Sequence, residues 1–199
     1  MATVTTARPL ALVALPEKGA ARLAVQVFLA VAGTLVLTLS AKVRVVVGPV
    51  DLSLQTLAIL ALSTAFGARL AIATLLLYMV EGAMGFPVFQ GTPEKGLGMA
   101  YMLGSTGGYL AGFVVMAAIV GYAADRGWDR SVVKLLAAML VAEAVMMAMG
   151  FSWLSVLIGA EKSWQFGVVP FIVPDLIKVA LAAVAVPAVW GLLPALRRG

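Results

Sequence analysis

The sequence has neither cysteine nor histidine among its 199 residues, and only 12% of the residues are charged. Without these two side chains it cannot form disulfides, thiolate or imidazole metal sites, cysteine nucleophiles or histidine general bases. We therefore expect no enzyme and no bound metal. The net charge of +5 gives no support for nucleic-acid binding, because in an apolar chain the side on which Lys and Arg lie matters more than their total.

Apolar residues dominate what is present: 63% of the chain is hydrophobic, and the mean hydropathy is +1.07. These values predict an integral membrane protein rather than a soluble domain. Spans of about 20 residues would fit six times, which predicts an all-α, compact bundle of six transmembrane helices. We expect a cytoplasmic N-terminal arm over residues 1–19 and one domain over residues 20–199. The predicted spans are residues 20–41, 52–66, 70–83, 108–124, 131–150 and 170–193.

Two connections are long. Residues 84–107 are rich in Gly and Pro and cannot form a regular span, so they predict a long outer loop between helices three and four. The stretch "SWLSVLIGAEKSWQFG" is expected to connect helices five and six. An even number of spans places both termini on one side of the membrane. Nine Lys or Arg residues fall on that side, and four fall on the opposite side. We therefore predict cytoplasmic termini in a multi-pass protein of a bacterial cytoplasmic (inner) membrane.

The last span contains two opposite charges, Asp175 and Lys178, within the run "VVPFIVPDLIKVALAAVAVP". A charge at bilayer depth costs roughly 2.5 to 3.5 kcal/mol even on a lenient insertion scale. Residues three apart share one helical face, so both side chains can point at one ligand. The alternative is an intrahelical ion pair with a structural role only, and this too needs a shielded cavity.

Four motifs in this order resemble signatures of the BioY family: "GPVDLSLQT", "YMVEGAMGFPVFQG", "GSTGGYLAGF" and "PFIVPDLIK". The resemblance covers about Ala41 to Leu181. It implies a biotin-specific substrate-binding subunit of an energy-coupling-factor transporter. The chain departs from the usual pattern at four positions near these motifs, namely Asp51, Ser53, Ser105 and Pro174.

Biotin offers two ureido N–H donors and a carbonyl at one end and a carboxylate at the other, and the last span can meet both kinds of group. Asp175 can accept from a ureido N–H, and Lys178 can meet a carboxylate or a carbonyl. The resemblance agrees, since it implies that the aspartate and lysine of this motif contact the ligand.

Five further side chains are candidates for the biotin site. Glu81 and Gln55 lie near the outer ends of their spans; Gln55 could equally bond a neighbouring helix. Phe89, with Phe86, could wall the thiophane ring and Gln90 could cap it, although aromatic residues near an interface also serve as membrane anchors. Tyr109 begins a helix after a Gly-rich turn. Glu143, in the middle of the fifth helix, has no assigned role.

The chain has no nucleotide-binding motif, so energy must come from elsewhere. The resemblance implies a transmembrane coupling protein and two ABC-type ATPase subunits that use ATP, and no cofactor in this chain. Small residues on the first helix predict a docking face, either at Ala20 and Ala24 or at Ala30 and Thr34, unless they only pack the bundle. A solitary carrier, coupled to an ion through Glu81 or Glu143, remains the alternative.

Overall fold

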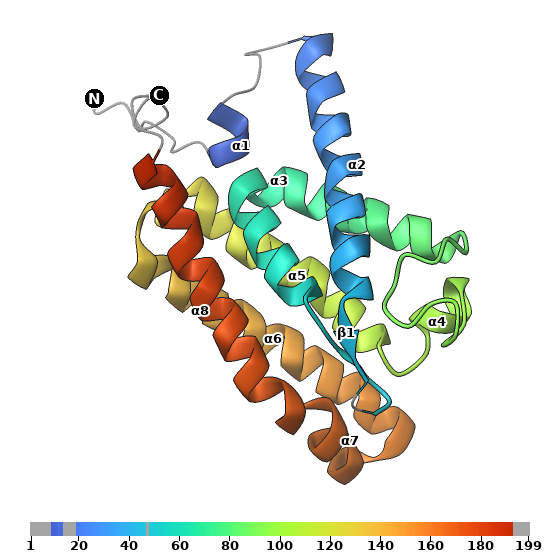
Figure 1. Cartoon of the computed structure of the whole chain (residues 1–199). Coiled ribbons are helices and arrows are strands. Elements are labelled where there is room, and N and C mark those ends of the chain that lie inside the picture. Colours follow the sequence, from blue (N-terminus) through green and yellow to red (C-terminus); the bar gives the residue numbers. More distant parts are fainter. Residues whose placement is uncertain (1–8, 14–18, 47, 193–199) are drawn as a thin grey trace.

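The computed structural model describes residues 9–13, 19–46 and 48–192 (Figure 1). The described chain is a bundle of helices with one small hairpin. Its elements are α1 (Leu10–Val13), α2 (Ala20–Lys42), β1 (Arg44–Val45), β2 (Leu52–Ser53), α3 (Gln55–Ala83), α4 (Gly98–Met102), α5 (Gly107–Asp125), the 3-10 helix η1 (Trp128–Arg130), α6 (Val132–Ile158), α7 (Ala160–Gly167) and α8 (Val169–Leu192).

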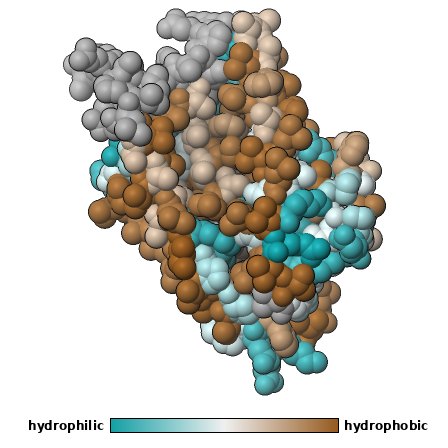
Figure 2. Space-filling model, in the orientation of Figure 1, coloured by the Kyte–Doolittle hydropathy of each residue, from teal (hydrophilic) through white to brown (hydrophobic). Residues whose placement is uncertain are grey.

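Five stretches of described helix are long and apolar enough to cross a membrane, with α3 counted once. Figure 2 shows apolar residues over most of one face, while hydrophilic residues gather around the segment that carries α4. The expected class, an all-α multi-pass membrane bundle, is therefore confirmed. The six predicted spans correspond to α2, the two halves of α3, α5, α6 and α8.

The second and third predicted spans are joined end to end in α3, which breaks at Gly67. This residue has φ 73° and ψ 171°, a backbone conformation that favours glycine. A Cβ there would lie 2.2 Å from Oδ1 of Asp125. The Oδ2 atom of Asp125 accepts a hydrogen bond of 3.1 Å from the backbone N–H of Ala68, the first residue after the break. The carboxylate thus caps the second half of the helix, and the two halves run in different directions (Figure 1).

Close packing of α5 against α6 forms the centre of the bundle. A Cβ at Gly112 would lie 2.9 Å from Cα of Met146, and one at Gly108 would lie 2.5 Å from the carbonyl of Met149. Only glycine at these two positions lets the helix backbones approach so closely, as is usual between membrane helices. The α5 helix also packs against α3, so it contacts both walls of the site described below.

We call the end of the bundle with the hairpin and α7 the outer end, and the opposite end the inner end. At the outer end β1 pairs with β2 antiparallel, Arg44 opposite Ser53. The predicted connection between helices five and six starts later than expected, because the fifth span does not end at residue 150. The α6 helix continues to Ile158, and after Gly159, with φ 86°, the chain forms α7. The stretch before Gly159 has no helix breaker, which explains the longer helix.

The start of α2 and the end of α8 both point toward the inner end, on different sides of the bundle (Figure 1). The predicted location of the termini concerns residues 1–8 and 193–199, which lie outside the described residues. The predicted N-terminal arm is described only at residues 9–13 and 19. There α1 packs against α3, and Pro9 lies beside the break at Gly67.

Candidate functional site

A small cavity lies toward the outer end, between the hairpin, α3, the loop after α3, α5, α6 and α8. Its free volume is about 30 Å³. One part of the wall is apolar and includes Leu110, Phe113, Met146, Met147 and Phe171. The polar part includes Asp51, Gln55, Gln90, Thr106, Asp175 and Lys178. An apolar wall with a few convergent polar groups is typical of a ligand site.

Asp175 and Lys178 form an ion pair on the cavity wall, one turn apart on α8. The Lys178 Nζ atom lies 2.7 Å from Oδ1 of Asp175. Both residues are buried, with 2% of Asp175 and 8% of Lys178 exposed. The other carboxylate oxygen, Oδ2, is buried and has no hydrogen-bond partner among the described residues. A buried acceptor without a partner carries a desolvation cost that a bound ligand can relieve.

Gln55 and Tyr109 also line the cavity, and each is fixed by a hydrogen bond. Gln55, the first residue of α3, donates from Nε2 to the hydroxyl of Tyr78 at 2.8 Å. Tyr109 donates its hydroxyl to the carbonyl of Gly167 at 2.7 Å. Its ring stacks with that of Phe171, with the ring centroids 6.2 Å apart. The hydroxyl of Tyr109 is therefore already engaged and is not a free donor for a ligand.

The loop between α3 and α5, residues 84–106, covers the cavity, and we call it the lid loop. Gln90 lines the cavity and donates from Nε2 to the carbonyl of Asp51 at 3.2 Å. Tyr101 lines it as well and donates its hydroxyl to the carbonyl of Gln90 at 2.6 Å. Burial raises the pKa of Tyr101 to about 12, so its hydroxyl stays protonated and keeps this bond at neutral pH.

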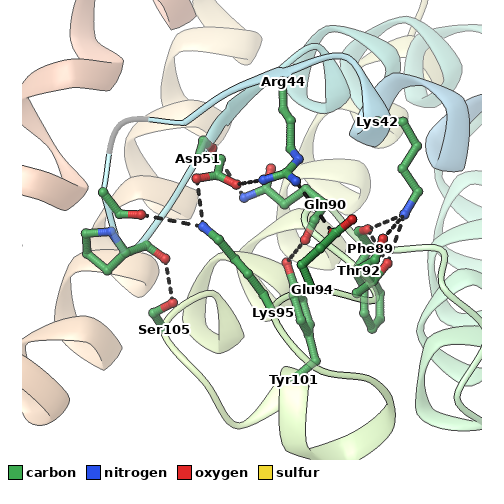
Figure 3. A network of polar contacts seen from close by, with 12 residues as sticks. Lys42, Arg44, Asp51, Phe89, Gln90, Thr92, Glu94, Lys95, Tyr101 and Ser105 are labelled. Atoms are coloured by element: carbon green, nitrogen blue, oxygen red, sulfur yellow. Dashed lines mark hydrogen bonds and ion pairs between the residues drawn. The ribbon is translucent and has the colours of Figure 1, made fainter.

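Asp51 is the main polar residue of this region that the sequence did not single out as a site residue (Figure 3). It is 2% exposed, and its two carboxylate oxygens are paired with two cations: Oδ2 lies 2.6 Å from Arg44 and Oδ1 lies 2.7 Å from Lys95. Lys95 belongs to the lid loop, and Arg44 to β1. Asp51 therefore ties the hairpin to the lid loop.

Two predicted contacts, Phe89 and Glu81, do not line the cavity. The ring of Phe89 lies edge-on to Tyr78 and stacked on Tyr101, with centroids 5.2 and 5.1 Å away. Phe89 is buried because its ring fills the space above Gly82, which has no side chain. Glu81 faces a groove beside α2, where it accepts a hydrogen bond of 3.0 Å from the hydroxyl of Thr34. Phe86 lines that groove and is exposed.

Of the predicted docking residues on α2, two are buried and two are exposed. Ala30 and Thr34 are buried, because this side of α2 packs against α3. Ala20 and Ala24 are exposed. Of the two alternatives, only the first pair is therefore accessible to a partner.

Curated proteins with similar sequences share one description. The chain is 33% identical over 154 residues to a protein named "Probable biotin transporter BioY" from Pyrococcus horikoshii, and the match covers 77% of this chain and 89% of that protein. It is 31% identical over 151 residues to "Biotin transporter BioY" from Thermotoga maritima, covering 75% of this chain and 86% of that protein.

The fold is also similar to a solved structure, the S-component for biotin from an ECF-type ABC transporter. The TM-score is 0.75 with 20% sequence identity, and the match covers 88% of this chain and 95% of that one. At this identity the similarity establishes the fold alone. The sequence model of the BioY family matches residues 11–195, nearly the whole chain. The chain therefore belongs to the BioY family.

Proposed function

We propose that this chain binds biotin in the cavity under the lid loop and serves as the substrate-specific subunit for its uptake. The observation that carries this proposal is the buried Oδ2 atom of Asp175, an acceptor on the cavity wall without a partner among the described residues. A ureido N–H is a donor suited to this atom. The names of the relatives, which are biotin transporters, support the choice of ligand.

The cavity also offers partners for the rest of the ureido ring and for the thiophane ring. The Nζ atom of Lys178 has three N–H donors, of which Asp175 takes one, so another can donate to the ureido carbonyl. The thiophane ring and the chain attached to it are apolar, and Phe113, Met146 and Phe171 provide an apolar wall for them.

The biotin carboxylate then faces the outer end of the cavity. Three cations lie beyond the cavity lining, around Asp51 and the lid loop: Lys42, Arg44 and Lys95. They meet two carboxylates, Asp51 and Glu94, so the region retains one positive charge. A carboxylate is favoured beside an uncompensated positive charge. The two ends of biotin would thus contact two different groups of charged residues.

Energy for uptake would come from other subunits: a transmembrane coupling protein and two ABC-type ATPase subunits in the cytoplasmic membrane. The ECF-type assembly named for the structural neighbour supports this arrangement. The exposed Ala20 and Ala24 would let a helix of the coupling protein approach α2 closely at the inner end. Ala20→Leu with Ala24→Leu should then prevent copurification of the complex while biotin binding persists.

Calorimetric titration of the detergent-purified chain with biotin tests the proposal, with other vitamins as controls. We expect saturable binding of biotin and none of the controls at the same concentration. Equal or stronger binding of another vitamin would overturn the assignment of the ligand. Biotin uptake by vesicles, with and without the ATPase subunits, then separates a subunit of an assembly from a solitary carrier.

A further inference from the structure

Glu143 is a buried carboxyl group that the proposed function leaves without a role. It lies on α6, and Met146 and Met147, one turn further along the helix, line the cavity. Its side chain is almost fully enclosed, with 8% of the residue exposed. Neither of its two oxygens has a hydrogen-bond partner among the described residues. A buried polar group in this condition requires an explanation, such as a proton or a ligand.

The charged groups that Glu143 faces are Asp175 and Lys178 on α8, both close enough to interact with it. Tyr109 on α5 interacts with Asp175, but its hydroxyl is donated to Gly167. The remaining charged or titratable side chains on the packed elements and on α6 itself are exposed or lie toward the inner end: Tyr122, Asp125, Asp129, Arg130, Lys134, Glu161 and Lys162.

The neighbouring charges determine whether Glu143 is ionised or protonated. Asp175 and Lys178 already neutralise each other. An ionised Glu143 would add a second carboxylate beside Asp175 in a buried place, and such a charge is so costly that the group takes up a proton instead. Two adjacent carboxyl groups that share one proton satisfy the same constraint in other proteins.

We propose that Glu143 carries a proton and donates its O–H to Oδ2 of Asp175, which makes Glu143 a positioning residue of the biotin site. The inference rests on the proposed function, because the oxygen that Glu143 would orient is the one assigned to the ureido N–H. A carboxylate oxygen has two lone-pair positions, so Oδ2 can accept from Glu143 and from biotin together. The proton supplies the donor that two ionised carboxylates lack.

Two substitutions separate this role from a purely structural one. Glu143→Gln keeps a donor, the amide NH₂, and should leave biotin affinity within about threefold of the unchanged protein. Glu143→Met keeps much of the volume without a donor and should weaken binding about tenfold, the effect of losing one hydrogen bond to a charged group. Glu161 is an exposed carboxylate on α7, so Glu161→Gln is the matched control. It should not change biotin affinity.

Infrared spectroscopy of the purified protein provides a readout that does not depend on the ligand's identity. The carbonyl stretch of a protonated carboxylic acid should be present without biotin, should be lost in Glu143→Gln, and should shift when biotin binds. Glu161→Gln should keep the band. Thermal melts without ligand establish that each variant is folded.

The outcomes are distinct. If the unchanged protein binds no biotin, the proposed function fails, while the infrared band still tests the protonation of Glu143. If biotin binds but Glu143→Gln loses as much affinity as Glu143→Met, Glu143 acts as an anion beside Lys178 and the proposal is overturned. Unchanged affinity in Glu143→Met, or a band that persists in Glu143→Gln, also overturns it.

Discussion

Two buried aspartates on the cavity wall, Asp51 and Asp175, differ in how they are partnered. Both are 2% exposed. Each oxygen of Asp51 is paired with its own cation, Arg44 or Lys95. Asp175 has one oxygen paired with Lys178, and its other oxygen has no partner among the described residues. The first carboxylate is satisfied by the fold itself, whereas the second is only half satisfied.

The surroundings of the two aspartates indicate what this difference means. Around Asp51 the hydrogen bonds connect separate segments: Ser105 donates to the carbonyl of Pro49 at 2.7 Å, and Gln90 donates to that of Asp51. The ion pair of Asp175 is with Lys178, on its own helix. A satisfied network stabilises one arrangement of loops, while an unsatisfied acceptor in a cavity is available to a ligand. Substitutions at the two sites should therefore act on different properties.

The largest loss of biotin affinity is expected from Asp175→Asn. The amide can present its NH₂ group where the ureido N–H requires an acceptor, and it also weakens the pairing with Lys178. We expect affinity to fall by roughly 2 to 5 kcal/mol, the range for truncating one partner of a buried charged hydrogen bond. Titration calorimetry measures this, with a thermal melt as the control for folding. Near-normal affinity would remove Asp175 from the site.

A smaller loss is expected from Lys178→Met, because the acceptor of Asp175 remains while one donor disappears. The affinity should fall by about 1.5 to 3 kcal/mol, the contribution of a hydrogen bond to a charged group. The single variant should also melt at a lower temperature, since Asp175 is left as an unpaired buried charge. The double variant with Asp175→Asn should regain stability without regaining affinity. Recovery of affinity in the double variant would instead indicate a purely structural pair.

The sequence allowed the Asp175 region to be predicted but not the Asp51 cluster. Two charges inside an apolar run are conspicuous, and their spacing places them on one helical face. The cations of Asp51 come from β1 and from the lid loop, and Lys95 lies 44 residues away in the chain. Such a contact depends on how the loop folds over the hairpin. The departure from the usual motif at Asp51 was the one sequence feature that pointed to this cluster.

In the fold, too, features set by the local sequence were predicted, and features set by tertiary contacts were not. Long apolar runs predicted the spans, because hydrophobic length is a local property of the sequence. The joining of two spans in α3 depends on Asp125, which caps Ala68 from another helix. The burial of Phe89 depends on the missing side chain of Gly82 and on the rings of Tyr78 and Tyr101. These tertiary contacts were not readable from the motifs alone.

Asp51→Asn should affect the lid loop more than the ligand. It weakens the attraction of Arg44 and Lys95, but both side chains are partly exposed and can be hydrated. We expect a loss of stability and of biotin affinity of about 1 kcal/mol each. Proteolysis after Lys95 should become faster, and saturating biotin should slow it in the unchanged protein. Ser105→Ala, which removes a neutral bond, is the milder control. Unchanged cleavage in both variants would contradict the role of Asp51 in holding the loop.

The smallest effect is expected from Glu81→Gln. Glu81 faces the groove beside α2 and not the cavity, and an amide oxygen can still accept the hydrogen bond from Thr34. Biotin affinity should therefore change by no more than about 0.5 kcal/mol, as for substitutions away from a site. Gln55→Met is the matched change on the same helix. It removes a polar group from the cavity wall and its bond to Tyr78, so it should weaken binding measurably. If Glu81→Gln weakens binding as much as Asp175→Asn, Glu81 belongs to the biotin site. In that case the number of hydrogen-bond partners of a buried carboxylate does not tell whether it binds the ligand or stabilises the fold.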